Sequence, residues 1–213
     1  YALLPWWAKR LAVSQGISPY GSIGGEIGPG IKERTQLTNG LLTGLLLAIG
    51  IAFDPIFLLP ALLLFAAFFL GSFLSGSIVG MQRLIKSFLM SMATAAFLHI
   101  PLLIDLLTGR PLNSLFGFEA WQKGELGTKG IFNLNTGSFT DSSVTWLLLV
   151  VAAFAMLVGT KNHLFVGIRS WLIIGIGFFT VWLADQGWWS GRVPEQETLF
   201  VIVAVGIAWA SAV

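Results

Sequence analysis

Aromatic rings, a cation and carboxylates gather in one short polar stretch near the end of the chain. Residues 185–197 read Asp-Gln-Gly-Trp-Trp-Ser-Gly-Arg-Val-Pro-Glu-Gln-Glu. Indole faces beside carboxylates suit contact with a sugar, and tryptophan also anchors proteins at the membrane–water interface. We expect Trp188, Trp189 and Arg192 to contact a glycan or a lipid, with plain anchoring as the alternative.

A second polar stretch, residues 108–143, contains an amphipathic segment, Leu112–Leu126, with Trp121 in it. Such a segment can lie on the membrane as a short helix and cover a site. It can also be a structured connector. Trp121 is therefore a further candidate contact for a glycan or a lipid.

Four ionisable residues lie within or next to apolar segments, where charge is costly and a function must be considered. His99 could relay a proton or bind a ligand, or it could be hydrogen-bonded inside a helical bundle. Asp54 precedes a proline and suits a turn. Asp105 and Asp185 lie at ends of apolar segments, and any of the three aspartates could act as a base in an outer loop.

The chain contains no recognisable catalytic centre of its own. It has no cysteine, no Asp-x-Asp pair for a metal-bound sugar nucleotide, no zinc-binding His-Glu-x-x-His and no serine nucleophile elbow. The glycine-rich residues 21–30 lack the Gly-Lys-Ser/Thr ending of a phosphate-binding loop and are predicted to be a connector. We expect no metal site and no cofactor.

Composition predicts the elements that must carry these loops. The chain is 55% hydrophobic and 10% charged, with a mean hydropathy of +0.82, which is typical of an integral membrane protein. The net charge of +2 and the scattered cations argue against a nucleic-acid partner. A bilayer core needs about 20 apolar residues in a helix. The predicted fold is an all-α polytopic integral membrane helical bundle with about six transmembrane helices: Leu37–Phe53, Ile56–Val79, Ser87–Leu107, Val144–Gly159, Val166–Ala184 and Thr198–Val213.

Several local features refine this organisation. Asp54-Pro55 predicts a tight turn between the first two helices, and Pro101 predicts a kink in the third. The pairs Gly40/Gly44 and Gly76/Gly80, together with a small-residue face at residues 71–77 of the second helix, predict close helix packing. Arg169 is expected to reach the inner interface.

The predicted organisation has four parts. Residues 1–36 form an interfacial helix, or the end of an earlier span, and the connector; residues 37–107 and 144–213 each contain three spans; residues 108–143 form a loop. Cytoplasmic loops are richer in Lys and Arg. This rule places the loops 108–143 and 185–197 outside, because it gathers most cations inside: Lys9, Arg10, Lys32, Arg34, Arg83, Lys86, Lys161 and Arg169.

A series of short motifs resembles the multi-spanning C-terminal region of large actinobacterial envelope proteins that carry a cytoplasmic family 2 glycosyltransferase domain. The motifs are Arg83–Leu89, Pro101–Leu103, Phe132–Gly137, Val158-Gly159, Arg169–Trp171, Gly187–Trp189 and Pro194-Glu195.

The resemblance implies the membrane-embedded part of a cell-envelope glycosyltransferase in a bacterial plasma membrane, building or exporting a glycan from nucleotide sugars or lipid-linked sugars. The catalytic nucleotide-sugar domain would lie outside this chain, which we expect to be part of a longer polypeptide. Its partners would be membrane lipid and other membrane proteins. A non-enzymatic membrane subunit or transporter module is the alternative, and an integral membrane glycosyltransferase using a lipid-phosphate sugar is a third possibility.

Overall fold

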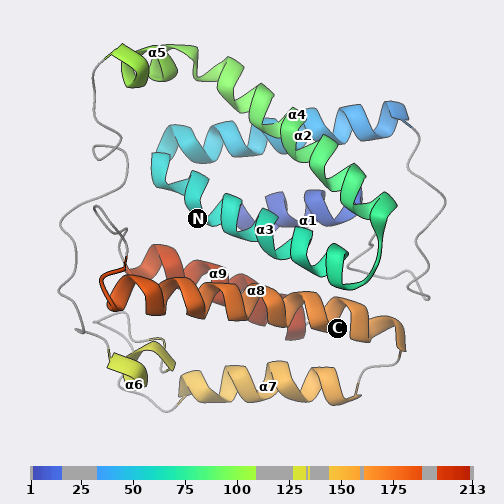
Figure 1. Ribbon diagram of the computed structural model, residues 1–213, viewed down its shortest axis with the longest axis vertical. Helices are drawn as coiled ribbons and strands as arrows, with labels where there is room; N and C mark the ends of the chain where they lie inside the picture. The colour runs from blue at the N-terminus through green and yellow to red at the C-terminus, as the bar shows by residue number, and fades with distance from the viewer. Residues whose placement is uncertain are drawn as a thin grey trace. The chain divides into compact units, whose positions relative to one another are not determined.

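The protein is described by a computed structural model that covers residues 2–15, 33–108, 127–132, 134, 144–158, 161–188 and 196–211. Every regular element within these residues is a helix (Figure 1). The chain divides into two compact units, Tyr1–Leu115 and Phe116–Val213, which we describe separately. The predicted all-helical fold is confirmed for the described part of the chain.

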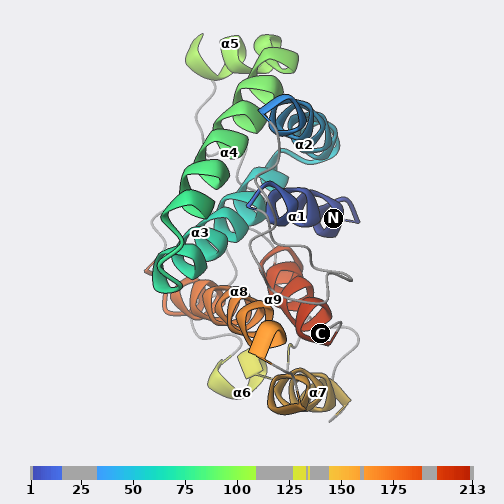
Figure 2. The same cartoon turned by 90° about the vertical axis from the view of Figure 1, so that its right-hand side faces the viewer.

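The first unit is built around two long helices that lie side by side. Its elements are α1 (Leu4–Ser14), α2 (Glu33–Phe53), a short 3-10 helix (Pro55–Phe57), α3 (Leu58–Leu74), α4 (Ile78–Leu98) and α5 (Ile100–Thr108). The most extensive packing joins α2 to α4, and α1 contacts α2, α3 and α4 (Figure 2). Leu4, Trp7, Ala8, Leu11 and Ala12 bury one face of α1 completely. The N-terminal helix is thus part of this packed unit.

Glycines bring α2 and α4 together. A Cβ atom at Gly40 would lie 3.1 Å from Met90 Cβ, and one at Gly44 would lie 2.9 Å from the Ser91 carbonyl oxygen. Any larger residue at Gly44 would push the two backbones apart. The close packing predicted from the Gly40/Gly44 spacing is confirmed.

The turn after α2 also agrees with the prediction. Asp54 is extended, with φ of −152°, and its Oδ1 accepts a hydrogen bond from the Ile56 N–H at 3.0 Å. Pro55, which has no N–H to donate, then begins the 3-10 helix. The Asp54-Pro55 pair therefore ends α2 and starts the next element.

The predicted boundary between the second and third spans is wrong. The helix α3 ends at Leu74 because Gly76 adopts a positive φ of 66°, with hydrogen bonds from Ser77 N to Ser72 O and from Gly76 N to Phe73 O, both 3.0 Å. The next helix, α4, begins at Ile78 and includes Arg83 and Lys86, which were expected to precede it. Gly76 and Gly80 thus belong to different elements, and the small-residue face of residues 71–77 is divided between a helix and a turn.

A break rather than a smooth kink separates α4 from α5. His99 ends α4 with φ of −109° and ψ of 26°, and Pro101 follows one residue into α5. Proline disfavours helical geometry at the preceding residue and removes a backbone donor. The predicted third span is therefore shared between two helices.

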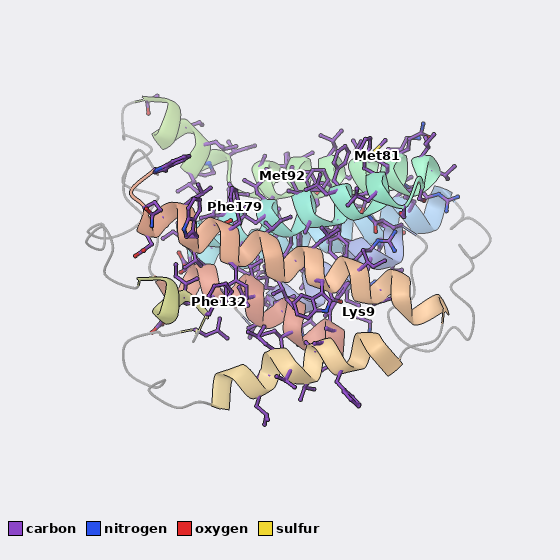
Figure 3. All side chains as sticks on the ribbon, turned by 60° about the horizontal axis from the view of Figure 1, so that its bottom comes forward. Lys9, Met81, Met92, Phe132 and Phe179 are labelled. Atoms are coloured by element: carbon purple, nitrogen blue, oxygen red, sulfur yellow. The ribbon has the colours of Figure 1, made fainter. Side chains whose placement is uncertain are left out.

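The second unit contains α6 (Gly127–Phe132), α7 (Val144–Val158), α8 (Lys161–Asp185) and α9 (Gln196–Ser211). Its main contact joins α8 to α9. Ile173, Ile174, Leu199, Ile202 and Val203 are at most 1% exposed and form this contact's apolar core. On α6, Phe132 packs against α8 through Phe178, with ring centroids 5.5 Å apart. Figure 3 labels Phe132 on α6.

Three described helical segments are long and apolar enough to cross a membrane: Gln36–Phe53, Pro55–Leu74 and Val166–Asp185. Two of the other predicted spans fall on shorter helices, the 15-residue α7 and the 16-residue α9. Large apolar side chains remain exposed on the helices, including Phe53, Phe73 and Phe154. These features are compatible with a membrane protein, and the figure of about six spans stays a prediction.

Candidate functional site

The end of α8 folds back on itself and fixes the first tryptophan of the polar loop. Gly187 has a positive φ of 69°, the Gly187 N–H donates to Ala184 O at 3.0 Å, and the Trp188 N–H donates to Leu183 O at 3.1 Å. This pair of bonds closes the helix end, and it depends on glycine because other residues adopt a positive φ only with strain. The turn returns the Trp188 indole toward α8.

As a result, three exposed rings form a continuous row at this end of α8, which we call the aromatic row: Phe179, Trp182 and Trp188. Ring centroids are 6.0 Å apart between Phe179 and Trp182, and 6.1 Å apart between Trp182 and Trp188. The exposed fractions are 57%, 37% and 73% in chain order. Figure 3 labels Phe179 at the start of the row.

The aromatic row offers flat apolar surface beside the polar loop. Such rings can contact the apolar face of a sugar or lie among lipid headgroups. The sequence identified Trp188 but missed Phe179 and Trp182, which lie inside an apolar span. The sequence could have indicated a shared surface, because Phe179 and Trp182 are three residues apart and such residues lie on one face of a helix.

Two of the predicted carboxylates, Asp54 and Asp185, and His99 have structural partners. Asp185 is 2% exposed and engages other groups of the protein. Asp54 caps the turn described above. The His99 Nε2 lies 2.8 Å from the Ala48 carbonyl oxygen. Because a carbonyl can only accept, Nε2 carries the hydrogen, and His99 joins α4 to α2 as a bundle histidine would.

Other predicted residues fall outside the part that can be described. Trp121, Trp189 and Arg192 lie outside the described residues, as does most of the loop 108–143. Asp105 belongs to α5, but its side chain is also outside the described part. Arg169 is 8% exposed and engages other groups of the protein, and its reach to the inner interface stays a prediction.

A second candidate site, which the sequence reading missed, is a group of buried polar side chains where α1, α2 and α4 meet. We call it the polar seam: Trp7, Asn39, Thr43, Arg83, Ser87 and Ser91. Asn39 holds α1 in place, because its Nδ2 donates to Arg10 O at 3.0 Å and its Oδ1 accepts from Arg10 Nη1 at 3.3 Å. Thr43 Oγ1 donates to Asn39 O at 2.6 Å. These two α2 side chains are satisfied.

The side chains from α1 and α4 are different. Trp7, Ser87 and Ser91 are each 0% exposed, and within the described part of the chain the Trp7 Nε1, Ser87 Oγ and Ser91 Oγ atoms have no hydrogen-bond partner. Arg83 is half-buried, and its Nη1 is also buried without a partner. Such groups are uncommon in folded proteins, and each requires an explanation. The sequence could have indicated a shared polar face, because Arg83, Ser87 and Ser91 lie at four-residue intervals on one helix.

Neither site resembles a metal centre. Over the residues that the structure describes, no group of three or more His, Cys, Asp or Glu side chains could hold a metal ion. The chemistry on offer is aromatic contact at the end of α8 and hydrogen-bond donation in the polar seam. Comparisons of the chain with protein-family models, curated proteins and solved structures find no match.

Proposed function

We propose that this chain is the membrane-embedded, glycan-handling part of a cell-envelope glycosyltransferase, with the end of α8 on the outer side of a bacterial plasma membrane. The observation that carries the proposal is the aromatic row, whose three rings are exposed and continuous beside a polar loop. The motif resemblance and the apolar helices support it. On this proposal the chain crosses the membrane about six times and uses a catalytic domain outside the sequence given.

The row would hold a sugar-bearing lipid or a growing glycan while transfer takes place elsewhere in the protein. Aromatic rings suit this task because they bind flat, apolar sugar faces without fixing a single orientation. The row itself offers no acid, base or nucleophile. Its role is therefore binding, and its loss should affect substrate affinity more than the rate of the chemical step.

A transfer assay tests the proposal. Membranes containing the full-length polypeptide are incubated with a radiolabelled nucleotide sugar or a polyprenyl-phosphate sugar, and incorporation into lipid-linked product is measured. Trp182→Ala and Trp188→Ala should each raise the KM for the sugar donor or acceptor about fivefold, as expected for one lost aromatic contact.

Trp6→Ala is the matched control. Trp6 is an exposed tryptophan, at 64%, on α1 in the other unit, so its removal tests the general effect of losing an indole. Equal effects of Trp6→Ala and Trp188→Ala would show that the row acts only as an interfacial anchor.

The size of the natural polypeptide separates the main alternatives. A mass far above 23.0 kDa, with a nucleotide-sugar-binding domain ahead of Tyr1, supports the transferase. A mass near 23.0 kDa would favour a non-enzymatic membrane subunit or transporter module. Transfer from the polyprenyl-phosphate sugar alone would instead favour a lipid-phosphate-sugar-dependent enzyme.

A further inference from the structure

The polar seam presents a row of hydrogen-bond donors along α4. Arg83, Ser87 and Ser91 are four residues apart, so their side chains lie on one face of the helix. Ser87 and Ser91 are fully buried, and neither hydroxyl has a partner among the described residues. Arg83 contributes a buried Nη1 at the start of the row.

Trp7 adds a donor from α1 at the same level. Its ring meets Phe88 edge-on, with centroids 6.5 Å apart and planes at 79°. The Gln15 carbonyl oxygen lies near Gly80, 3.8 Å from where a Cβ would be. Thus α1 runs antiparallel to α4, and Trp7 lies against Phe88, the residue that follows Ser87. The indole Nε1 can only donate.

The charge near the seam favours an anion. Arg10 and Arg83 lie at its end, and Lys86 is exposed on the next part of α4. Asp54 is the only carboxylate among the described side chains of this unit, and it follows the opposite end of α2. The unpartnered Gln15 Oε1 is the one dedicated acceptor among these buried atoms, and it lies about two turns of α1 from Trp7.

We propose that the polar seam binds the phosphate group of an anionic phospholipid. A phosphate supplies acceptor oxygens for the guanidinium, the Ser87 hydroxyl and the indole N–H, and its lipid tails suit the exposed apolar surface of the helices. Arg83 provides the charge, while Ser87 and Trp7 orient the phosphate. This proposal is independent of whether the chain handles a glycan.

Entry of the phosphate requires a small outward shift of α1. The described side-chain bonds that hold α1 to neighbouring helices are those between Arg10 and Asn39 and the one from Gln15 Nε2 to Ser72 Oγ, at 3.2 Å. A phosphate between α1 and α4 satisfies donors that the closed seam leaves unsatisfied. Binding therefore compensates for the packing lost when α1 moves.

Native mass spectrometry of the protein released from nanodiscs tests the proposal. With equal amounts of phosphatidylglycerol and phosphatidylcholine, the unaltered protein should retain phosphatidylglycerol selectively. Arg83→Gln should reduce the retained fraction roughly tenfold, the effect of losing one hydrogen bond to a charged group. Ser87→Ala, which removes one hydroxyl and little volume, should also reduce the retained fraction. It provides the test if Arg83→Gln fails to fold.

Lys86→Gln is the matched control, because it removes one positive charge from the same helix at an exposed position. It should change retention less than twofold, as expected for a screened surface charge. Equal losses for Lys86→Gln and Arg83→Gln, or unaltered retention in both Arg83→Gln and Ser87→Ala, would overturn the proposal.

A test with inorganic phosphate distinguishes a lipid phosphate from free phosphate as the group that is bound. In phosphatidylcholine nanodiscs, millimolar phosphate should leave the unfolding temperature of the protein unchanged. A rise that Arg83→Gln abolishes would overturn the assignment to a lipid and identify a site for free phosphate.

Discussion

The α2–α4 pair and the α8–α9 pair use the same device for close packing but differ in what they bury. In both pairs a glycine lets two helices approach: Gly44 lies against Ser91 in one, and Gly206 lies against Ile174 and Ser170 in the other. The core between α8 and α9 is apolar. Where α1 joins α2 and α4, polar side chains are buried beside apolar ones.

The serines and threonines show the difference most clearly. On α8, Ser170 Oγ donates to Val166 O at 2.9 Å and Thr180 Oγ1 donates to Ile176 O at 2.7 Å, so both buried hydroxyls are satisfied within their own helix. On α4, the buried hydroxyls of Ser87 and Ser91 have no partner among the residues that the structure describes. The Trp171 indole Nε1 on α8 is likewise buried without one, so the two pairs differ in their hydroxyls rather than in every polar group.

The largest expected effect breaks the feature that the two pairs share. Gly44→Leu and Gly206→Leu should each lower the free energy of unfolding by about 3 kcal/mol, because the added side chain meets backbone atoms of the facing helix. Thermal unfolding followed by circular dichroism measures this. Gly175→Ala is the control, since nothing lies within 4 Å of its added Cβ. If the Leu variants were as stable as Gly175→Ala, the close approach in either pair would be wrong.

A smaller effect tests the polar contact that joins α1 to the α2–α4 pair. Asn39→Ala removes the bonds between α2 and α1 and leaves the Arg10 carbonyl without its side-chain donor, which should lower the free energy of unfolding by about 2 kcal/mol. Gln82→Ala, at an exposed position on α4, should change it by less than about 0.5 kcal/mol. Similar stability of the two variants would mean that Asn39 does not hold α1 in place.

The smallest effect sharpens the contrast between satisfied and unsatisfied hydroxyls. In detergent without phospholipid, Ser87→Ala should be more stable than Ser170→Ala by about 1 kcal/mol, because only the first removes a polar group that has no partner. Both replacements add an alanine to a helix, so helix propensity cancels in the comparison. Added phosphatidylglycerol should remove the difference. A difference of the opposite sign would place an internal partner at Ser87.

Composition and turn chemistry were sufficient to predict much of the fold. The apolar blocks predicted an all-helical chain, and the Asp54-Pro55 pair predicted the turn after α2 because proline restricts the residue before it. The end of α3 was missed because Gly76 lies within a run of small and apolar residues, where a helix-ending glycine resembles a packing glycine. Hydropathy likewise hid the continuity of α4 through Arg83 and Lys86.

The sites were harder to predict, for a physical reason. Trp188 was identified because it lies in the polar stretch 185–197. Trp182 and Phe179 form one surface with it only because Gly187 turns the chain back onto α8. The polar seam depends on contacts between α1 and α4, which are far apart in sequence. A single serine in an apolar helix is usually satisfied by its own backbone, so Ser87 becomes informative only once its surroundings are known.

The proposed function depends on an orientation in which Trp188 lies on the outer side of the membrane, while the cation rule predicts an inner position for Lys86. Because the chain has no cysteine, Trp188→Cys and Lys86→Cys can each be labelled without background. In intact cells, a membrane-impermeant maleimide should label Trp188→Cys, whereas Lys86→Cys should be labelled only after permeabilisation. Labelling of Lys86→Cys in intact cells, or protection of Trp188→Cys, would contradict the account.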